Sequence, residues 1–532
     1  MKKTIIILLS ACICCLPAVA QGVIDALPAL SGQLQGSARY SSMGGAFGAL
    51  GGDLTSIRQN PAGIGVYRSS EVSVTAGLNF YNNNVTTPTS SSKNDGFYFT
   101  GDNLGIVGVI KFKSGIMRNL NFGFAYNNIA NYNNKYNAYW DNINSSLTEM
   151  IAANSSSLGI LPSDLAISGS YDPYMYDMSW ISVLAYNTYL MNPTGENSDK
   201  YTSIYRRGTT KGRAELETFT SGAIDEYDFN ISGNMLDKFY WGVTLNVTNI
   251  NYNIDSYYGE ALQDAEVAAT ADGRVSVTDG SFVLQNTLTT KGVGVGVKLG
   301  VIYRPINYLR LGVAFHSPTY YDMTDTYMAA VGYQFSDVNG KAISGSRDDI
   351  NNQTNIGQFK YNLTTPWHIM ASAAAVLGKS AIISFDYEYI DAPAMYYSGS
   401  VDYANSSNMY IKEQMQGVHN LRVGAEYRIT PSLSLRAGYA YESSPMKSQY
   451  YDGSDTPQVV DGTLTQYHIP NDAHNISCGV GYRINNVNID LAYVHRMQDY
   501  SIYPYVTAGS SYKPTIMDMH HNSVKLSVGY RF

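Results

Sequence analysis

The chain has 532 residues, of which 43 are Asp or Glu and 35 are Lys or Arg, so its formal net charge is −8. Charged residues make up only 15 % of it, against about 25 % in soluble domains, yet its mean hydropathy is −0.18. These values exclude a helical membrane protein, and the 46 tyrosines exclude a disordered chain. A transmembrane β-barrel fits both values, because each strand alternates lipid-facing with lumen-facing residues. The acidic balance also argues against nucleic acid as a partner.

The N-terminus has the pattern of a secretory signal peptide. Lys2 and Lys3 precede a mostly apolar run, and Ala18-Val19-Ala20 gives a cleavage pattern before Gln21. We therefore predict a signal peptide over residues 1–20 and an exported protein. A lipobox-like motif ending at Cys12 offers a lipoprotein alternative, but it leaves an apolar region of only about eight residues.

Residues 21–68, called the N-terminal segment below, are small and weakly charged and show no strand alternation. Asp53 is placed to cap a short helix over residues 54–59, which Pro61 and Gly63 would end. The segment is too long for a linker and too short for a domain, so we expect it to lie inside the barrel.

Strict alternation of apolar and polar residues begins at about residue 69 and continues to the C-terminus. In the last run, Val524, Leu526, Val528 and Tyr530 alternate with polar or small residues, which is typical of a strand between lipid and a wet lumen. We predict about fourteen such strands, each long enough to cross the apolar band. They cover residues 69–82, 96–113, 119–131, 223–235, 238–258, 281–304, 307–330, 355–377, 380–400, 409–428, 432–445, 473–484, 487–502 and 521–532.

The connections between these runs alternate between short and long. This rhythm is the layout of an outer-membrane barrel with short periplasmic turns, long extracellular loops and both termini on the periplasmic side. A soluble sandwich or propeller would not require it. The long connections are residues 83–95, 131–222, 259–280, 331–354, 401–408, 446–472 and 503–520.

The connection over residues 131–222 is far longer than a passive loop. It is rich in Asn, Ser and Tyr, and helices are expected around residues 145–157 and 178–190. It is either an external lid or ligand platform, or a folded surface cap with no role in transport.

Several motifs resemble the FadL/TodX-type outer-membrane transporters, which carry long-chain fatty acids or aromatic hydrocarbons and include members labelled hemin receptors. The similar stretches are Met43-Gly44-Gly45-Ala46-Phe47, Asp53, Asn60-Pro61-Ala62-Gly63, Tyr303-Arg304-Pro305, Thr365-Pro366-Trp367, Arg422 to Tyr427 and Leu435 to Tyr439. The resemblance implies a fourteen-stranded barrel over residues 69–532, plugged by the N-terminal segment as a hatch. The long 131–222 loop and the single acidic residue, Asp53, near the hatch helix depart from the family pattern.

The resemblance implies passive, hatch-gated uptake of hydrophobic small molecules such as long-chain fatty acids. Met43 and Phe47 are candidate pocket contacts, although packing against the wall is the alternative. The implied ligand-binding or gating residues are Met43, Gly44, Gly45, Phe47, Asp53, Asn60, Pro61, Ala62 and Gly63.

Alternation places seven charged residues on the lumen face. Such a cluster would anchor the hatch or a substrate carboxylate, or it would only brace the lumen with salt bridges. The residues are Arg310, Arg422, Glu426, Arg428, Arg436, Arg483 and Arg531.

No nucleophile-elbow or zinc-protease motif occurs, so we predict no enzyme, no cofactor and no metal. The scattered histidines lack metal-ligand spacing: His316, His368, His419, His474 and His495. Expected partners are a hydrophobic ligand, outer-membrane lipid and, through the C-terminal strand, the barrel assembly machinery, with the protein a monomer. The rival function is a surface-exposed barrel that binds heme, glycan or a host protein without translocation.

Overall fold

The computed structural model describes residues 22–532 except residues 31, 177, 196, 271–272, 338, 340–352, 379, 400–403, 456–463 and 507–512. The predicted signal peptide over residues 1–20 therefore lies outside the described residues. In the part of the chain that is described, no helix is long and apolar enough to cross a membrane.

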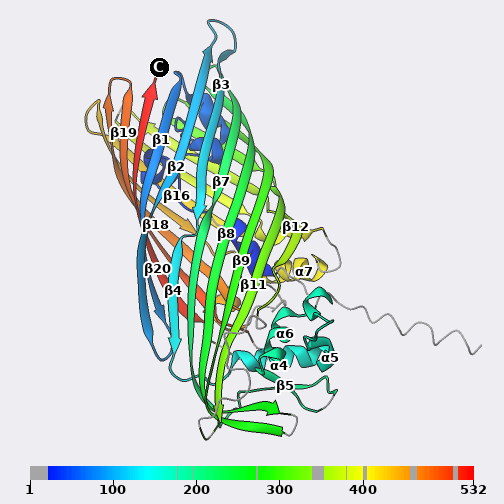
Figure 1. Ribbon diagram of the computed structural model, residues 1–532. Helices are drawn as coiled ribbons and strands as arrows, with labels where there is room; N and C mark the ends of the chain where they lie inside the picture. Colours follow the sequence, from blue (N-terminus) through cyan, green and yellow to red (C-terminus); the bar gives the residue numbers. More distant parts are fainter. Residues whose placement is uncertain are drawn as a thin grey trace, which may run out of the picture.

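The strands form one closed antiparallel barrel of 14 strands, which confirms the predicted fold class (Figure 1). Nearly every strand pairs with its neighbour in sequence, and β20 closes the barrel on β1. The first half of the wall comprises β1 (Glu71–Thr86), β2 (Ser91–Lys111), β3 (Met117–Asn131), β4 (Asn134–Trp140), β7 (Lys211–Met235), β8 (Phe239–Thr270) and β9 (Gly273–Ile306). The second half comprises β10 (Leu309–His316), β11 (Tyr320–Asp337), β12 (Gly357–Thr364), β13 (His368–Leu377), β14 (Ala381–Ile390), β15 (Tyr396–Ser398), β16 (Val418–Arg428), β17 (Leu433–Glu442), β18 (Tyr467–Ile484), β19 (Val487–Tyr503) and β20 (Thr515–Arg531). These 18 elements make 14 barrel strands, because β3–β4, β10–β11, β12–β13 and β14–β15 are each two parts of one interrupted strand.

Side chains in β20 follow the predicted alternation. Val524, Leu526 and Val528 are exposed on the outer face, whereas Lys525 is fully buried. The Lys525 ammonium lies 3.0 Å from a carboxylate oxygen of Asp102 in β2. The outer face is therefore suited to lipid, and the charges are paired inside.

Three predicted strands are interrupted, and a fourth is partly helical. The run 307–330 divides into β10 and β11, and the run 355–377 into β12 and β13. The run 380–400 becomes β14, a 3₁₀ turn η4 (Ala392–Ala394) and β15. Pro318, Pro366 and Pro393 lie at these breaks, because a proline cannot donate a ladder hydrogen bond.

The predicted strand over 409–428 begins only at Val418. Residues before it form helix α7 (Ala404–Gln414). Ser407, Ile411 and Gln414 are buried at intervals of four and three residues, which is the spacing of one helix face and not of a strand.

Several predicted loops are instead continued strands. The 259–280 connection belongs to a long β8–β9 hairpin, and strands β4 and β7 shorten the 131–222 connection to residues 141–210. Beyond the apolar band both faces of a strand meet water or protein, so the hydrophobic alternation fades while the ladder continues.

Residues 141–210, called the loop unit below, contain α4 (Leu147–Leu158), α5 (Pro162–Leu165), η2 (Pro173–Tyr176), α6 (Trp180–Asn187) and the hairpin β5–β6 (Met191–Pro193, Tyr201–Ser203). Both expected helices are present, as α4 and α6. Buried Leu147, Ile151 and Leu184 share one apolar core with Tyr258 and Phe282 of the extended strands. Figure 1 shows this unit at the end of the barrel opposite the C-terminus.

The N-terminal segment contains α1 (Val23–Leu30), α2 (Ala38–Ser42), α3 (Ser56–Gln59) and the 3₁₀ turn η1 (Pro61–Val66). Helix α1 packs with α7, while η1 packs against the inner side of β7, β8 and β9. A further short helix, α8 (Ser448–Tyr451), precedes β18.

The regular helix α3 begins at Ser56, two residues later than expected, and Thr55 before it makes no side-chain capping bond. The capping bond predicted for Asp53 is present at the turn that leads into this helix. The Asp53 carboxylate accepts hydrogen bonds from Thr55 N (2.9 Å) and Ser37 Oγ (2.7 Å), which orders the turn before the helix. Pro61 does not simply end the helix, because it starts η1 behind the Asn60 cap.

Candidate functional site

Glycines in the wall let the N-terminal segment approach the barrel backbone. A Cβ atom added at Gly424 or Gly438 would overlap the backbone of Met43 or Gly44. The same holds for Gly312 against Gly48. Close backbone packing of this kind requires residues without side chains on the lumen face.

The predicted hatch residues form the packed interior of this contact. Met43 and Phe47 are fully buried and pack with Tyr40, Leu50 and Ala374. Gly44 and Gly45 have φ values of +61° and +74°, a conformation that glycine adopts readily.

Asn60 holds two parts of the segment together. Its Nδ2 atom donates to Gly48 O (2.6 Å), and its Oδ1 atom accepts from Ala62 N (3.1 Å). Asp53, Pro61, Ala62 and Gly63 are also buried. None of the nine predicted hatch residues lines the cavity described below, so we interpret them as packing residues.

Part of the predicted lumen charge cluster contacts this segment. Glu426 Oε2 accepts from Arg39 Nε of α2 (3.0 Å) and from Arg436 Nε (2.7 Å), and Arg436 also pairs with Asp490 (2.6 Å). Arg310 Nη1 donates to Leu50 O (2.5 Å). Sequence reasoning missed Arg39, although it lies four residues before the Met43 motif.

The other predicted lumen charges lie away from the Glu426 network. Arg422 pairs with Glu388 (2.6 Å) farther along the lumen, and Arg531 pairs with Glu71 near the end of the barrel that holds the C-terminus. Arg428 and Arg483 are exposed, so neither belongs to the buried network.

A cavity of about 410 Å³ lies in the lumen between the N-terminal segment and the wall. One part of its lining is apolar and aromatic, with Leu27 and Leu30 of α1 and Tyr321 and Ile390 of the wall. The lining also holds cationic side chains, namely Arg58, Lys298, Arg422 and Arg496, and the acidic Asp25, Glu388 and Glu442. The cavity therefore suits an apolar molecule that carries a polar group.

Arg422 is a cation in this lining with a buried donor atom that lacks a hydrogen-bond partner. Its Nη2 atom donates to Glu388 Oε2, but its buried Nη1 atom has no hydrogen-bond partner. A buried donor left unsatisfied costs about 1–3 kcal/mol, so a rotation that turned Nη1 into the cavity and onto an anion would be favourable.

The wall has a break in its ladder beside the cavity. Backbone pairing of β2 with β3 ends at Asn103–Asn127, although β2 continues along β1 and β3 continues along β7. Ile129 is an extra residue in β3, since Asn128 and Ala130 pair with consecutive residues of β7. Tyr98, Ile129 and Tyr132 at this break all line the cavity.

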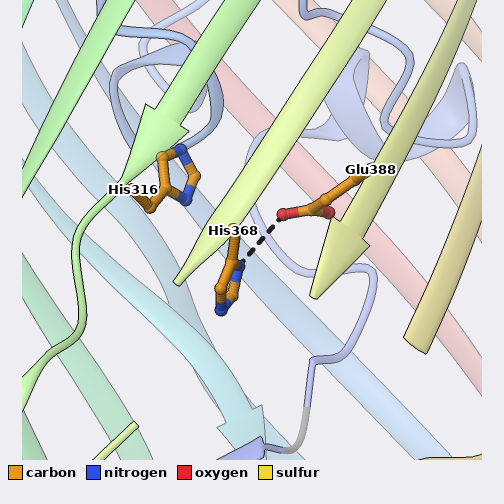
Figure 2. A group of neighbouring side chains, drawn as sticks. All are labelled: His316, His368 and Glu388. Atoms are coloured by element: carbon orange, nitrogen blue, oxygen red, sulfur yellow. Dashed lines mark hydrogen bonds and ion pairs between the residues drawn. The ribbon is translucent and has the colours of Figure 1, made fainter. Parts of the chain in front are cut away.

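Two histidines that are far apart in the sequence meet at the cavity. His316, His368 and Glu388 each offer a ligand atom, and these atoms lie within 4.8 Å of one another. Figure 2 shows the three side chains close together on β10, β13 and β14, with a dashed line that joins His368 to Glu388. Among the described residues, this is the one group of three or more His, Cys, Asp or Glu side chains whose ligand atoms lie close enough together to hold a metal ion.

Residues 225–532 match the sequence model of a family described as outer membrane protein transport protein (OMPP1/FadL/TodX). The fold is similar to that of a Pseudomonas aeruginosa FadL homologue, with a TM-score of 0.50 and 12 % identity, covering 94 % of this chain and 98 % of that one. The P. putida toluene transporter TodX aligns with a TM-score of 0.47 and 12 % identity, and the alignment covers 94 % of this chain and 99 % of that one. The Ralstonia pickettii toluene transporter TbuX aligns with a TM-score of 0.44 and 14 % identity, and the alignment covers 94 % of this chain and 98 % of that one. No curated protein matches the sequence.

Proposed function

Because this chain belongs to the OMPP1/FadL/TodX family of outer membrane transport proteins, we propose that it is a monomeric, non-enzymatic channel for passive uptake of hydrophobic small molecules. We further propose that its ligands include amphiphiles with a carboxylate, such as long-chain fatty acids. The observation that supports this choice is the apolar cavity with the unpartnered Arg422 Nη1 atom in its wall.

The cavity lining supports a two-part mode of binding. An acyl chain would lie against Leu27, Leu30 and Ile390, where each buried methylene contributes about 0.8 kcal/mol. A carboxylate would accept a charge-assisted hydrogen bond from Arg422, which is about twice as strong as a neutral one. A monoaromatic hydrocarbon would use the apolar part alone.

We propose that the exit from the cavity is the ladder break between β2 and β3. Side-chain bonds to the backbone of β4, the strand that follows β3, span this region: Ser92 Oγ of β2 donates to Asn137 O, and Asn83 Nδ2 of the adjacent β1 donates to Lys135 O (2.7 Å). Side-chain bonds are released with less disruption than a continuous ladder. A hydrophobic ligand leaving here would enter lipid and avoid the aqueous periplasm.

The test compares uptake of labelled oleate, toluene and hemin in cells that lack the gene and in complemented cells. We expect oleate and toluene uptake to be restored by the natural chain. Arg422→Gln should lower oleate uptake about tenfold, the equivalent of one charge-assisted bond, and leave toluene uptake unchanged. Arg428→Gln is the matched control, because Arg428 is on the same strand but exposed.

Arg422→Gln also leaves Glu388 without its cation, so folding must be checked separately. Arg422→Lys, which keeps the charge, should retain most oleate uptake, and heat-dependent migration in SDS gels reports an intact barrel. If the cells take up toluene but not oleate, the proposal of carboxylate-bearing ligands is refuted, whereas the proposal of a channel for hydrophobic molecules stands. Uptake of none of the three by a folded protein would refute the channel and favour a binding or structural barrel.

A further inference from the structure

The register of the wall brings two imidazoles and a carboxylate to one side of the lumen. His316, the last residue of β10, pairs directly with His368, the first residue of β13. Glu388 in β14 pairs with Met370, two residues after His368, so it occupies the diagonal position. Side chains at direct and diagonal positions on one face of a sheet are within mutual reach.

The hydrogen bonds of His316 leave one ring nitrogen available. His316 Nε2 lies 2.9 Å from Gln59 O of the N-terminal segment. A carbonyl oxygen only accepts, so Nε2 carries the hydrogen and Nδ1 presents its lone pair. A histidine that ligates a metal ordinarily donates its other N–H in this way, to a carbonyl or carboxylate.

The carboxylate is held with one oxygen free for the imidazoles. Glu388 Oε2 accepts from Arg422 Nη2 (2.6 Å) and Asn420 Nδ2 (3.3 Å), while Oε1 lies 3.2 Å from His368 Nδ1 (Figure 2). Two ligands at about 2.0–2.2 Å from a tetrahedral zinc ion lie about 3.3–3.5 Å apart. The His368–Glu388 pair already has nearly this separation.

We propose that His316, His368 and Glu388 form a binding site for a divalent transition metal of the zinc class. His316 Nδ1, His368 Nδ1 and Glu388 Oε1 would be the ligands, and the metal would replace the hydrogen between His368 and Glu388. All three residues line the cavity, so a fourth coordination position faces it. Two nitrogens and one oxygen with an open position suit zinc, copper or nickel better than calcium or magnesium.

The site lies where three interrupted strands meet the N-terminal segment. Each ligand lies beside one of the proline-containing breaks in β10–β11, β12–β13 and β14–β15. Through Gln59, His316 also contacts the N-terminal segment. A bound metal would therefore add a side-chain link across three strands that the backbone ladder already joins, next to that segment. This inference does not depend on which ligand the channel carries.

The experiment titrates the full-length protein, purified in detergent without a histidine tag and stripped with EDTA. Zn²⁺ binding is measured by calorimetry, and Co²⁺ binding by its visible absorption, which reports tetrahedral coordination. We expect one metal per chain. His316→Ala/His368→Ala should weaken binding about 100-fold or more, since two of three protein ligands are lost.

The control variant is His419→Ala/His474→Ala. These histidines bond Tyr387 and Tyr439 (both 2.8 Å) away from the site and should leave binding unchanged. If the double variant fails to fold, the single His368→Asn variant replaces it, with an expected loss of about tenfold. Absence of binding to the natural chain, or unchanged binding to a folded His316 or His368 variant, would overturn the proposal. The rings of His495 and His520 stack on each other at another place in the barrel. Binding that is lost in His495→Ala/His520→Ala but kept in the His316 and His368 variants would also overturn the proposal.

Discussion

The Arg39 guanidinium of α2 lies 3.0 Å from the Glu426 carboxylate of β16, which joins the N-terminal segment to the barrel wall by a nearly buried ion pair. The same carboxylate oxygen accepts from Arg436, and Arg39 Nη1 also donates to Gly52 O (3.1 Å). Arg39 therefore fixes α2 to the wall and to its own segment at once.

Arg39→Ala should loosen this attachment. Breaking a buried pair by removing one partner costs about 3–5 kcal/mol, although Arg436 still neutralises Glu426 and reduces that cost. We expect more frequent and larger openings in planar-bilayer recordings, approaching those of a chain that lacks residues 21–60. Arg68→Ala is the control, because the exposed Arg68–Asp237 pair contributes little. Equal conductance of the Arg39 variant and the natural chain would contradict an anchoring role.

Gly438→Ala tests whether the wall glycines seat the N-terminal segment. The added methyl group would overlap the Gly44 backbone, which has no side chain to move away. We expect the segment to shift, with raised conductance and faster protease cleavage between residues 36 and 52. Gly108→Ala in β2 is the control, since nothing lies within 4 Å of an added Cβ there. Identical cleavage of both variants would argue that the contact is adaptable.

The barrel was predictable because its signal is local. Alternation within each strand reveals which residues face lipid, and it correctly places Glu426 and Arg436 inside. It does not reveal where a ladder stops, so alternation alone predicts continuous strands through Pro318 and Pro366. Both prolines were visible in the sequence, and their missing donor was the available signal.

The site was less predictable because it depends on register. His316 and His368 are distant in sequence and meet only because β10 pairs with β13 in one particular alignment. Likewise, Arg39 reaches Glu426 across the lumen from a segment that has no alternation. Contacts of this kind follow from the closed barrel and not from any local pattern.

Glu260 should make the attachment of the loop unit depend on pH. Its carboxyl group lies on β8 beyond the predicted membrane-spanning run 238–258, and it accepts from Ser146 Oγ (2.6 Å) and Leu147 N (2.8 Å) of α4. Burial raises the pKa of Glu260 from 4.5 to about 7. The folded state thus holds the proton more tightly, so this attachment is most stable below about pH 4.5 and weakens as pH rises through 7.

Hydrogen exchange of the α4 amides, corrected for intrinsic rates, measures this effect. Protection should be greater at pH 5 than at pH 8, by about 3 kcal/mol at most, since each pKa unit corresponds to about 1.4 kcal/mol. Glu260→Gln should remove the dependence. Glu266→Gln on the same strand is the control, because Glu266 pairs with Arg206 instead. A pH dependence that persists in the Glu260 variant would assign it to another group.

Deleting Ile129 tests the proposed exit. Because Asn128 and Ala130 already pair with Asp225 and Ile224, removing the extra residue makes the β3–β7 ladder continuous without reversing the side chains that follow. A straighter β3 would lie along β2 beyond Asn103, where pairing now stops. We expect uptake to fall about tenfold or more, since each backbone bond added across the break contributes about 1 kcal/mol against opening. Ile129→Ala keeps the bulge and should preserve uptake. Full uptake by a folded deletion variant would show that ligands leave the cavity elsewhere.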